Sequence, residues 1–131
     1  MWGIIFERYK LRWAPLWVGI AWTLVATVVY LSLAKLEVDV PGAHADKYAH
    51  TAAYAALMFW FAQIYASAYS RVIIACALAL LGIGLEYLQA YTDYRTFERA
   101  DIVADIAGIV LGWLAAPPRT PNLLLRVESS I

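Results

Sequence analysis

Four long apolar segments, separated by clusters of charged residues, dominate the hydrophobic pattern of the chain. They cover about residues 14–34, 47–70, 72–92 and 101–116. A helix of roughly 20 apolar residues crosses the hydrocarbon layer of a bilayer, and the first three segments reach that length. Membrane strands would alternate apolar and polar positions, whereas these runs are continuous. The pattern therefore predicts an all-α polytopic membrane protein, a bundle of four transmembrane helices in one domain over residues 1–131.

The first apolar segment has two interpretations. Ser32, Leu33 and Ala34 loosely resemble the small-residue cleavage site of a secretory signal peptide. The apolar stretch before them exceeds the roughly 7–15 residues usual in such peptides. We therefore expect a signal anchor that is retained as the first transmembrane helix.

The composition agrees with a membrane protein. Hydrophobic residues make up 63% of the chain and charged residues 15%, against roughly 45–50% and about 25% in soluble domains. A soluble domain of this size still exposes about a third of its unfolded surface, which argues against a soluble globular enzyme. Ten basic and ten acidic side chains cancel, which argues against nucleic-acid binding. The single cysteine, Cys76, is interpreted as a small buried apolar residue.

Basic residues near the segment ends predict the orientation of the helices, because such residues concentrate on the cytoplasmic side of a membrane. With a cytoplasmic N-terminus, six basic residues lie on that side and four on the other. The cluster before the first segment dominates, so we expect both termini in the cytoplasm. The six are Arg8, Lys10, Arg12, Arg71, Arg119 and Arg126, and the four are Lys35, Lys47, Arg95 and Arg99.

Short connections shape the predicted bundle. Ser70 and Arg71 lie between the second and third segments, so these two helices are expected to form a tight antiparallel hairpin. Prolines soon after residue 116 end the fourth helix, because proline lacks an amide donor. The tail over residues 122–131 is expected to be a frayed or interfacial end.

Polar side chains gather on one face of each of the last three segments, since residues three or four apart share a helix face. The sets are Lys47, His50 and Tyr54, just after Asp46; Glu86, Gln89 and Asp93; and Asp101 and Asp105, which share their face with Gly108 and Gly112. Antiparallel neighbours bring the start of the second helix, the end of the third and the start of the fourth to one membrane surface, the outer one. We expect an outward-facing polar pocket there, completed by Arg95 and Arg99.

Most of these residues also have a structural interpretation. Asp46 and Asp101 suit helix N-caps, and Lys47 can extend its ammonium group to the lipid headgroups. Hydrogen bonds between helices are the alternative for His50, Tyr54 and Gln89. The two arginines can be ordinary loop charges, and the two glycines are expected to be helix-packing residues. Glu86 is the exception, because a charge within hydrocarbon costs upwards of about 2.5 kcal/mol and this position lies deep in its segment.

The spacing of these residues resembles that of the VanZ-like family of small bacterial membrane proteins. Three blocks over about residues 46–113 carry the resemblance, in the family's order. They are Asp46-Lys47-x-x-His50-x-x-x-Tyr54-x-x-Leu57, Gly82-x-x-x-Glu86-x-x-Gln89 and Arg99-x-Asp101-x-x-x-Asp105-x-x-Gly108-x-x-x-Gly112. The resemblance implies a multi-pass protein of the bacterial inner (cytoplasmic) membrane. The family's name-giving members are associated with resistance to glycopeptide antibiotics, chiefly teicoplanin.

One position departs from the family pattern. Family members usually have asparagine where this chain has Asp105, which places a second acidic residue next to Glu86. Two explanations are open. Either the two carboxyl groups share a proton, as coupled pairs do, or a basic residue compensates the added charge.

Three classes of function are compatible with the predicted pocket. The first is binding of an anionic or glycosylated membrane lipid or lipid-linked cell-wall precursor, since basic side chains form charge-assisted hydrogen bonds with phosphate. The second is a membrane-embedded hydrolase or transferase, with His50, Glu86 and Asp105 as general acid and base. The third is a small transporter or proton relay, for which a homo-oligomer formed through Gly108 and Gly112 would provide a path.

The sequence predicts no metal site and leaves any cofactor open. Among the helical residues, His50 is the one nitrogen ligand, although His44 in the preceding loop could join it. A metal held by histidine and carboxylates would usually need more such ligands than this. No nucleophile motif accompanies the acids and the histidine.

Overall fold

The computed structural model describes residues 8–33, 45–91, 99–117 and 119–130. Within these ranges the chain forms five helices and no strand, apart from an isolated bridge between Arg8 and Tyr65. The helices are α2 (Ala14–Leu33), α3 (Ala45–Ile64), α4 (Ala68–Ala90), α5 (Arg99–Leu114) and α6 (Leu123–Ser130). The prediction of an all-α fold is confirmed.

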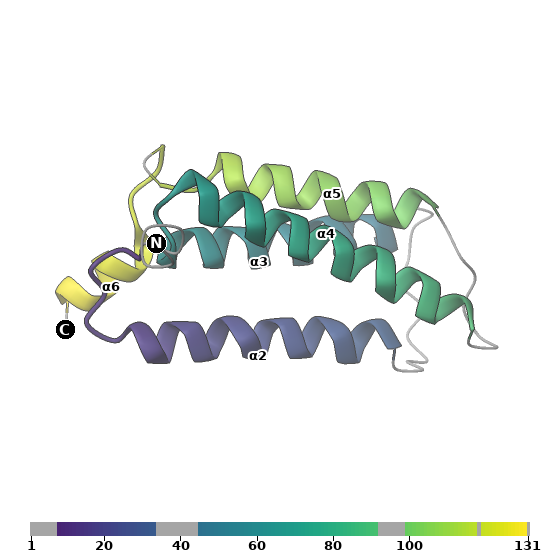
Figure 1. The fold of residues 1–131 in the computed structure, drawn as a ribbon, viewed down its shortest axis with the longest axis horizontal. Helices are drawn as coiled ribbons and strands as arrows, with labels where there is room; N and C mark the ends of the chain where they lie inside the picture. Colours follow the sequence, from purple (N-terminus) through teal and green to yellow (C-terminus); the bar gives the residue numbers. More distant parts are fainter. Residues whose placement is uncertain (1–7, 34–44, 92–98, 118, 131) are drawn as a thin grey trace.

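The four long helices form an antiparallel bundle (Figure 1). α2, α3, α4 and α5 alternate in direction, and the short α6 lies at the end where α2 begins. α3 occupies the centre, because it contacts α2, α4, α5 and α6. The starts of α3 and α5 and the ends of α2 and α4 therefore meet at the opposite end of the bundle. We call this the α5-start end, and the other the α6 end.

Two apolar clusters hold the bundle together. The first lies between α3, α4 and α5 and the second between α2, α3 and α6. The first is built from Tyr54, Leu57, Met58, Ala62, Leu78, Ile109 and Ala116, and the second from Leu11, Trp17, Ala21, Phe61, Ile64 and Leu124. α3 contributes to both, which explains its central position.

The turn between α3 and α4 differs from the sequence prediction. The second apolar segment was expected to reach residue 70, but α3 ends at Ile64 and α4 begins at Ala68. The Ser67 hydroxyl caps α4 by accepting a hydrogen bond from Ser70 N at 3.1 Å. Such a cap satisfies a free amide of the first turn. Ser70 and Arg71 are therefore buried residues of α4, not a loop between helices.

Two of the helices, α2 and α4, are long and apolar enough to cross a membrane, judged over the described part of the chain. α5 falls short because 16 residues at about 1.5 Å each span less than the roughly 30 Å of a hydrocarbon core. α3 is long enough, but polar residues occupy its first turns. Cys76, expected to be buried, is exposed on α4 and shares that surface with large apolar residues such as Leu80.

The chain after the prolines forms the helix α6 and packs against the start of α2, so of the two predicted forms of the tail, frayed or interfacial, it is not frayed. In α6, Glu128 accepts hydrogen bonds from Arg12 N at 2.6 Å, from Trp13 N at 2.8 Å and from the Trp17 indole at 2.7 Å. These donors precede or begin α2, so Glu128 supplies acceptors for its free amide groups. The last helix is thus fastened to the first.

The carboxyl group of Glu128 predicts a loss of stability in acid. Burial raises its pKa, but the hydrogen bonds from Trp13, Trp17 and Arg12 outweigh burial and lower it. A lowered folded-state pKa adds stability that is complete above the unfolded value and is lost as pH falls through the folded value. We therefore expect the melting temperature in detergent to decrease when the pH is lowered past about 4.5.

The matched variant for this test is Glu128→Gln. It is expected to be less stable than the wild type at pH 7 and to show a weaker pH dependence below about pH 4.5. Thermal unfolding followed by tryptophan fluorescence measures both. Parallel pH profiles for the two proteins would contradict the role assigned to this carboxylate.

Candidate functional site

A histidine and an aspartate from different helices form the centre of the candidate site. His50 Nδ1 on α3 lies 2.9 Å from Asp105 Oδ1 on α5. The Asp105 side chain is 4% exposed and the His50 side chain 20%. With Asp105 ionised, Nδ1 carries the proton of this bond, because an ionised carboxylate only accepts hydrogen bonds. His50 is thus a basic residue that pairs with Asp105, the position at which this chain departs from the VanZ-like pattern that it resembles.

Close approach of the backbones places these two residues together. A Cβ atom at Gly108 would collide with Thr51 O on α3 and would lie 3.0 Å from Ala55 N. A Cβ at Gly112 would likewise collide with Ala55 O. The Thr51 hydroxyl donates to Ala104 O at 3.2 Å, which adds a polar link between the same helices. The two glycines therefore serve as packing residues between α5 and α3 within the chain.

A third glycine makes room for the carboxylate itself. Gly82 on α4 faces Asp105, and a Cβ there would lie 2.6 Å from Asp105 Oδ2. Glu86 follows Gly82 by one helical turn and so lies on the same face of α4. Its side chain is buried, with 2% of the residue exposed, and it is near enough to act electrostatically on His50, as is Asp101.

Gln89 connects this group to the first long helix. Its Nε2 donates to Ser32 O at 2.7 Å near the end of α2, and the residue is 3% exposed. The bond joins residues 57 positions apart in the chain. It fixes the end of α2 beside the polar face of α4, so α2 becomes one wall of the site.

A cavity of about 180 Å³ lies between α2, α3 and α4. Its polar lining comes from all three and consists of Ser32, His50, Tyr54 and Gln89. Its apolar lining consists of Val28, Leu31, Ala49 and Ala53. Because Asp105 holds Nδ1, Nε2 is the ring nitrogen of His50 that remains for a ligand in this cavity.

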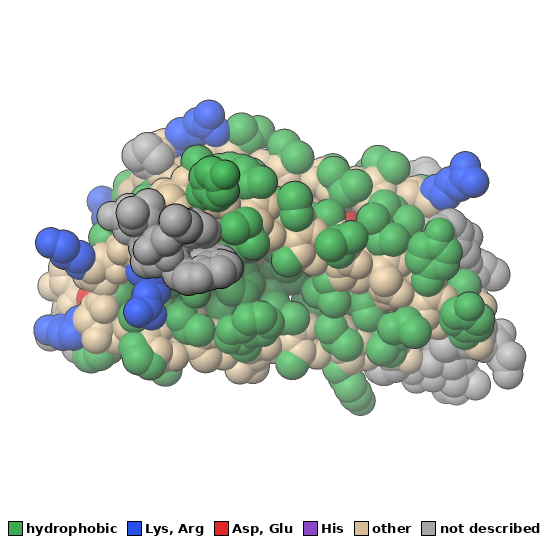
Figure 2. All heavy atoms as spheres, viewed as in Figure 1, with side chains coloured by type: hydrophobic (Ala, Val, Ile, Leu, Met, Phe, Trp, Pro, Cys, Tyr) green, Lys and Arg blue, Asp and Glu red, His purple; other side chains and the backbone are tan. Residues whose placement is uncertain are grey.

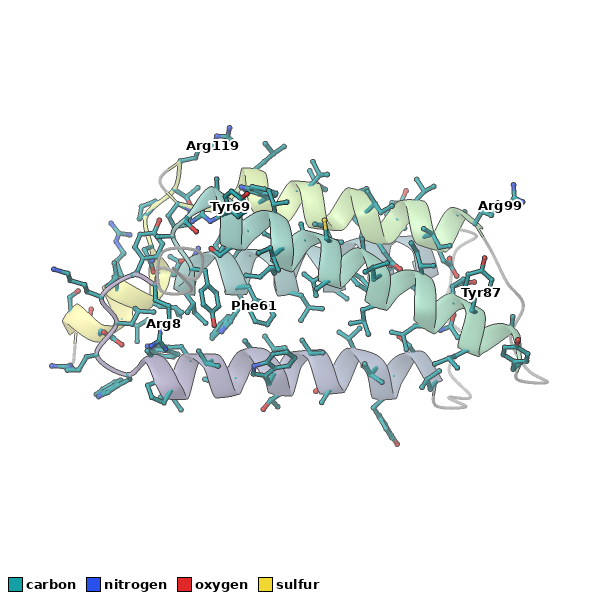
Figure 3. All side chains as sticks on the ribbon, in the orientation of Figure 1. Arg8, Phe61, Tyr69, Tyr87, Arg99 and Arg119 are labelled. Carbon is teal, nitrogen blue, oxygen red and sulfur yellow. The ribbon has the colours of Figure 1, made fainter. Side chains whose placement is uncertain are left out.

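The structure brings together six of the residues singled out from the sequence. His50, Tyr54, Glu86, Gln89, Asp101 and Asp105 all lie toward the α5-start end of the bundle. Arg99 is exposed at the start of α5, and Figure 3 shows it pointing away from the bundle. Arg95, His44 and the side chains of Asp46 and Lys47 lie outside the described part of the chain.

Sequence reasoning missed two features of the site. Ser32 lines the cavity, although the sequence suggested only a cleavage signal there. Thr51 bonds to Ala104 O beside the pair, but it follows His50 directly and so lies outside the stripe of residues that the spacing identifies. Neither residue stands out by spacing or charge, so no sequence signal identified them. Within the described residues, no group of three or more histidine, cysteine, aspartate or glutamate side chains could hold a metal ion.

A family model described as VanZ/LLP1 matches residues 4–124. The match extends the similarity beyond the three motif blocks to α2 and to the start of α6. No curated protein and no solved structure matches the chain.

Proposed function

This chain belongs to the VanZ/LLP1 family, and we propose that it is a multi-pass protein of a bacterial inner membrane that binds an anionic or glycosylated envelope lipid. The observation that carries the proposal is the cavity of about 180 Å³ in which Ser32, His50, Tyr54 and Gln89 meet aliphatic side chains. A pocket of mixed polarity between helices suits a ligand with a polar head and an apolar body.

We propose four membrane spans, formed by α2 to α5. Figure 2 shows hydrophobic side chains over the middle of the visible face, with lysine and arginine towards its ends. Large apolar residues such as Trp22, Leu80 and Val103 are 61%, 69% and 66% exposed. Apolar surface of this extent is unusual in a soluble monomer, and acyl chains would cover it. α5 is shorter than the layer, and local thinning of the bilayer accommodates such a helix where it packs against its central partner α3.

The α6 end is the cytoplasmic end in this proposal. Most basic residues of the described chain lie there, and cytoplasmic ends of membrane helices are rich in lysine and arginine. They are Arg8, Lys10, Arg12, Arg71, Arg119 and Arg126. The cavity near the α5-start end then opens toward the outer half of the membrane, where cell-wall precursors are used.

The lining favours a phosphate or sugar head. His50 Nε2 can accept a hydrogen bond from a sugar hydroxyl, or donate one to a phosphate oxygen once the ring is protonated. The Tyr54 hydroxyl can do either. Hydrogen bonds to charged groups contribute roughly 1.5–3 kcal/mol, enough for selective recognition of one head group.

Binding of a lipid-linked cell-wall precursor tests this proposal. Native mass spectrometry of the detergent-solubilised protein should detect the bound precursor, with phosphatidylethanolamine as the comparison lipid. Tyr54→Phe removes one hydroxyl from the cavity and keeps the buried ring. We expect it to weaken binding about fivefold, the effect of losing about 1 kcal/mol.

The control for that experiment is Tyr48→Phe on the same helix. Tyr48 is 73% exposed and does not line the cavity, so its affinity should equal that of the wild type. Equal binding by all three proteins, or no preference for the precursor over phosphatidylethanolamine, would refute the proposed site.

A second function is supported by the His50–Asp105 pair. A carboxylate that holds one ring nitrogen of histidine orients the other as a general base, as in hydrolases with a catalytic triad. We propose as the alternative a membrane-embedded hydrolase or transferase acting on a lipid-linked substrate. Turnover of a lipid-linked diphosphate that disappears in His50→Gln would favour it. Binding of that lipid without turnover, with or without divalent ions, would favour the binding function.

A link to glycopeptide resistance is the cellular consequence we propose. Expression of the chain in a susceptible bacterium should raise the inhibitory concentration of teicoplanin. Tyr54→Phe at matched expression should raise it less than the wild type. Unchanged susceptibility would separate this chain from the resistance role of its family.

A further inference from the structure

Arg71 is a buried cation at the α6 end, far along the bundle from the cavity described above. It lies in the first turn of α4 and is 5% exposed. Its guanidinium donates to Tyr65 O at 3.1 Å, Pro117 O at 2.6 Å, Ala62 O at 2.9 Å and the Tyr9 hydroxyl at 3.3 Å. All four acceptors are neutral oxygen atoms.

No carboxylate of the described chain compensates the charge of Arg71. The acidic residue described at this end, Glu128, is already engaged by the amides and the indole at the start of α2. A buried charge without a counter-charge carries a desolvation cost, which neutral acceptors offset only in part. The positive end of the α4 helix dipole adds to the positive potential at this point. A bound anion would balance it.

A cavity beside Arg71 has room for such an anion. It measures about 230 Å³ and is lined by Arg71, Trp113, Ala116, Pro117 and Arg119. This is several times the roughly 30 Å³ that a water molecule occupies in the liquid. Arg119 is exposed and extends outward from the bundle (Figure 3), so its side chain can close over a bound group.

From this arrangement we propose that the cavity between Arg71 and Arg119 binds an anionic phosphate group. Arg71 keeps one of its five N–H groups after these four hydrogen bonds, and it contributes mainly its positive charge. The guanidinium of Arg119 supplies donors in the planar arrangement that matches phosphate oxygens. The site lies at the end of the bundle opposite to the His50 cavity, so it does not depend on the function proposed for that cavity. The phosphate can belong to the headgroup of an anionic membrane lipid or to free inorganic phosphate, which the experiment distinguishes.

The experiment uses the full chain in an uncharged detergent and phosphate-free buffer. Phosphatidylglycerol is added in one arm, inorganic phosphate in a second, and phosphatidylcholine, whose phosphate is neutralised by its own choline, in a third. Binding is measured as an increase in melting temperature, which follows ligand concentration relative to Kd, and by native mass spectrometry. We expect stabilisation by phosphatidylglycerol or by inorganic phosphate, and none by phosphatidylcholine.

Arg119→Ala is the informative variant. Arg71 donates hydrogen bonds to four oxygen atoms of the chain, so replacing it can unfold the protein. Loss of one charge-assisted contact is expected to raise Kd about tenfold. Arg126→Ala is the matched control, since Arg126 is exposed at the same end but does not line the cavity. Its Kd should stay within about twofold of the wild type.

Each outcome decides the proposal. Stabilisation by phosphatidylglycerol alone identifies a lipid headgroup as the source, and stabilisation by inorganic phosphate shows that the free anion suffices. The phosphate site is refuted if neither ligand stabilises the protein or if phosphatidylcholine acts as strongly as phosphatidylglycerol. Equal weakening by Arg119→Ala and Arg126→Ala also refutes it, because it would indicate attraction to the basic surface as a whole.

Discussion

Gly108→Ala is expected to destabilise the bundle by about 3 kcal/mol, at the upper end of the usual cost of overpacking. The added methyl group would meet Thr51 O, Thr51 C and Ala55 N, all backbone atoms of α3. Flexible side chains could turn aside, but a helix backbone moves only as a unit. Because α5 carries Asp105 on the same face, the shift would also lengthen its hydrogen bond to His50. Chemical unfolding in mixed micelles measures the effect.

Gly84→Ala provides the control for this prediction. Gly84 lies within α4, and a Cβ there would meet no atom within 4 Å. Alanine favours a helix over glycine by roughly 0.5–1 kcal/mol, so this variant should be slightly more stable than the wild type. A similar loss of stability in Gly84→Ala and Gly108→Ala would show that the contact between α3 and α5 is not the cause.

His50→Ala is expected to cost about 3 kcal/mol, because it leaves the buried Asp105 carboxylate without its hydrogen-bond partner. The partial exposure of His50, 20% of its side chain, places this value at the lower end of the range for buried pairs. Asp105→Asn should cost less, since the amide oxygen of asparagine can still accept the hydrogen bond from Nδ1. Asparagine is also the residue usual in the family at this position.

The double variant tests whether the pair acts as a unit. His50→Ala combined with Asp105→Asn should be more stable than His50→Ala alone, because the remaining buried group is then uncharged. A double-mutant cycle measured by thermal unfolding gives the coupling between the two residues. If the two effects simply add, the 2.9 Å contact contributes no specific interaction and the centre of the candidate site must be sought elsewhere.

Much of the candidate site could be predicted from its spacing. His50 and Tyr54 share one helix face, as do Glu86 and Gln89, and antiparallel helices bring these faces to one end. The structure describes all four at that end of the bundle. The spacing could not predict Ser32. Its place in the site depends on its backbone carbonyl oxygen, which accepts a hydrogen bond from Gln89 Nε2, 57 residues further along the chain.

The predicted fold differs from the structure at two charged residues that are buried. The sequence predicts Arg71 in the link between helices, yet it donates to carbonyl oxygens of Ala62 in the last turn of α3 and of Pro117 just after α5. The sequence predicts Glu128 in a frayed or interfacial tail, and the structure shows that it accepts hydrogen bonds from the start of α2. In both cases the partners are backbone groups left free at helix ends, and such groups leave no mark in the sequence.

The sequence by itself determined the helical class, the long apolar segments and which polar residues share a helix face. Each of these depends on the order and period of side chains along one segment. Only the tertiary structure decided which acid meets the histidine. Asp105 hydrogen-bonds to His50 because glycines at 82 and 108 let α5 approach α4 and α3 closely. Pairing across 55 positions depends on the separation and rotation of whole helices, which packing sets and local periodicity does not.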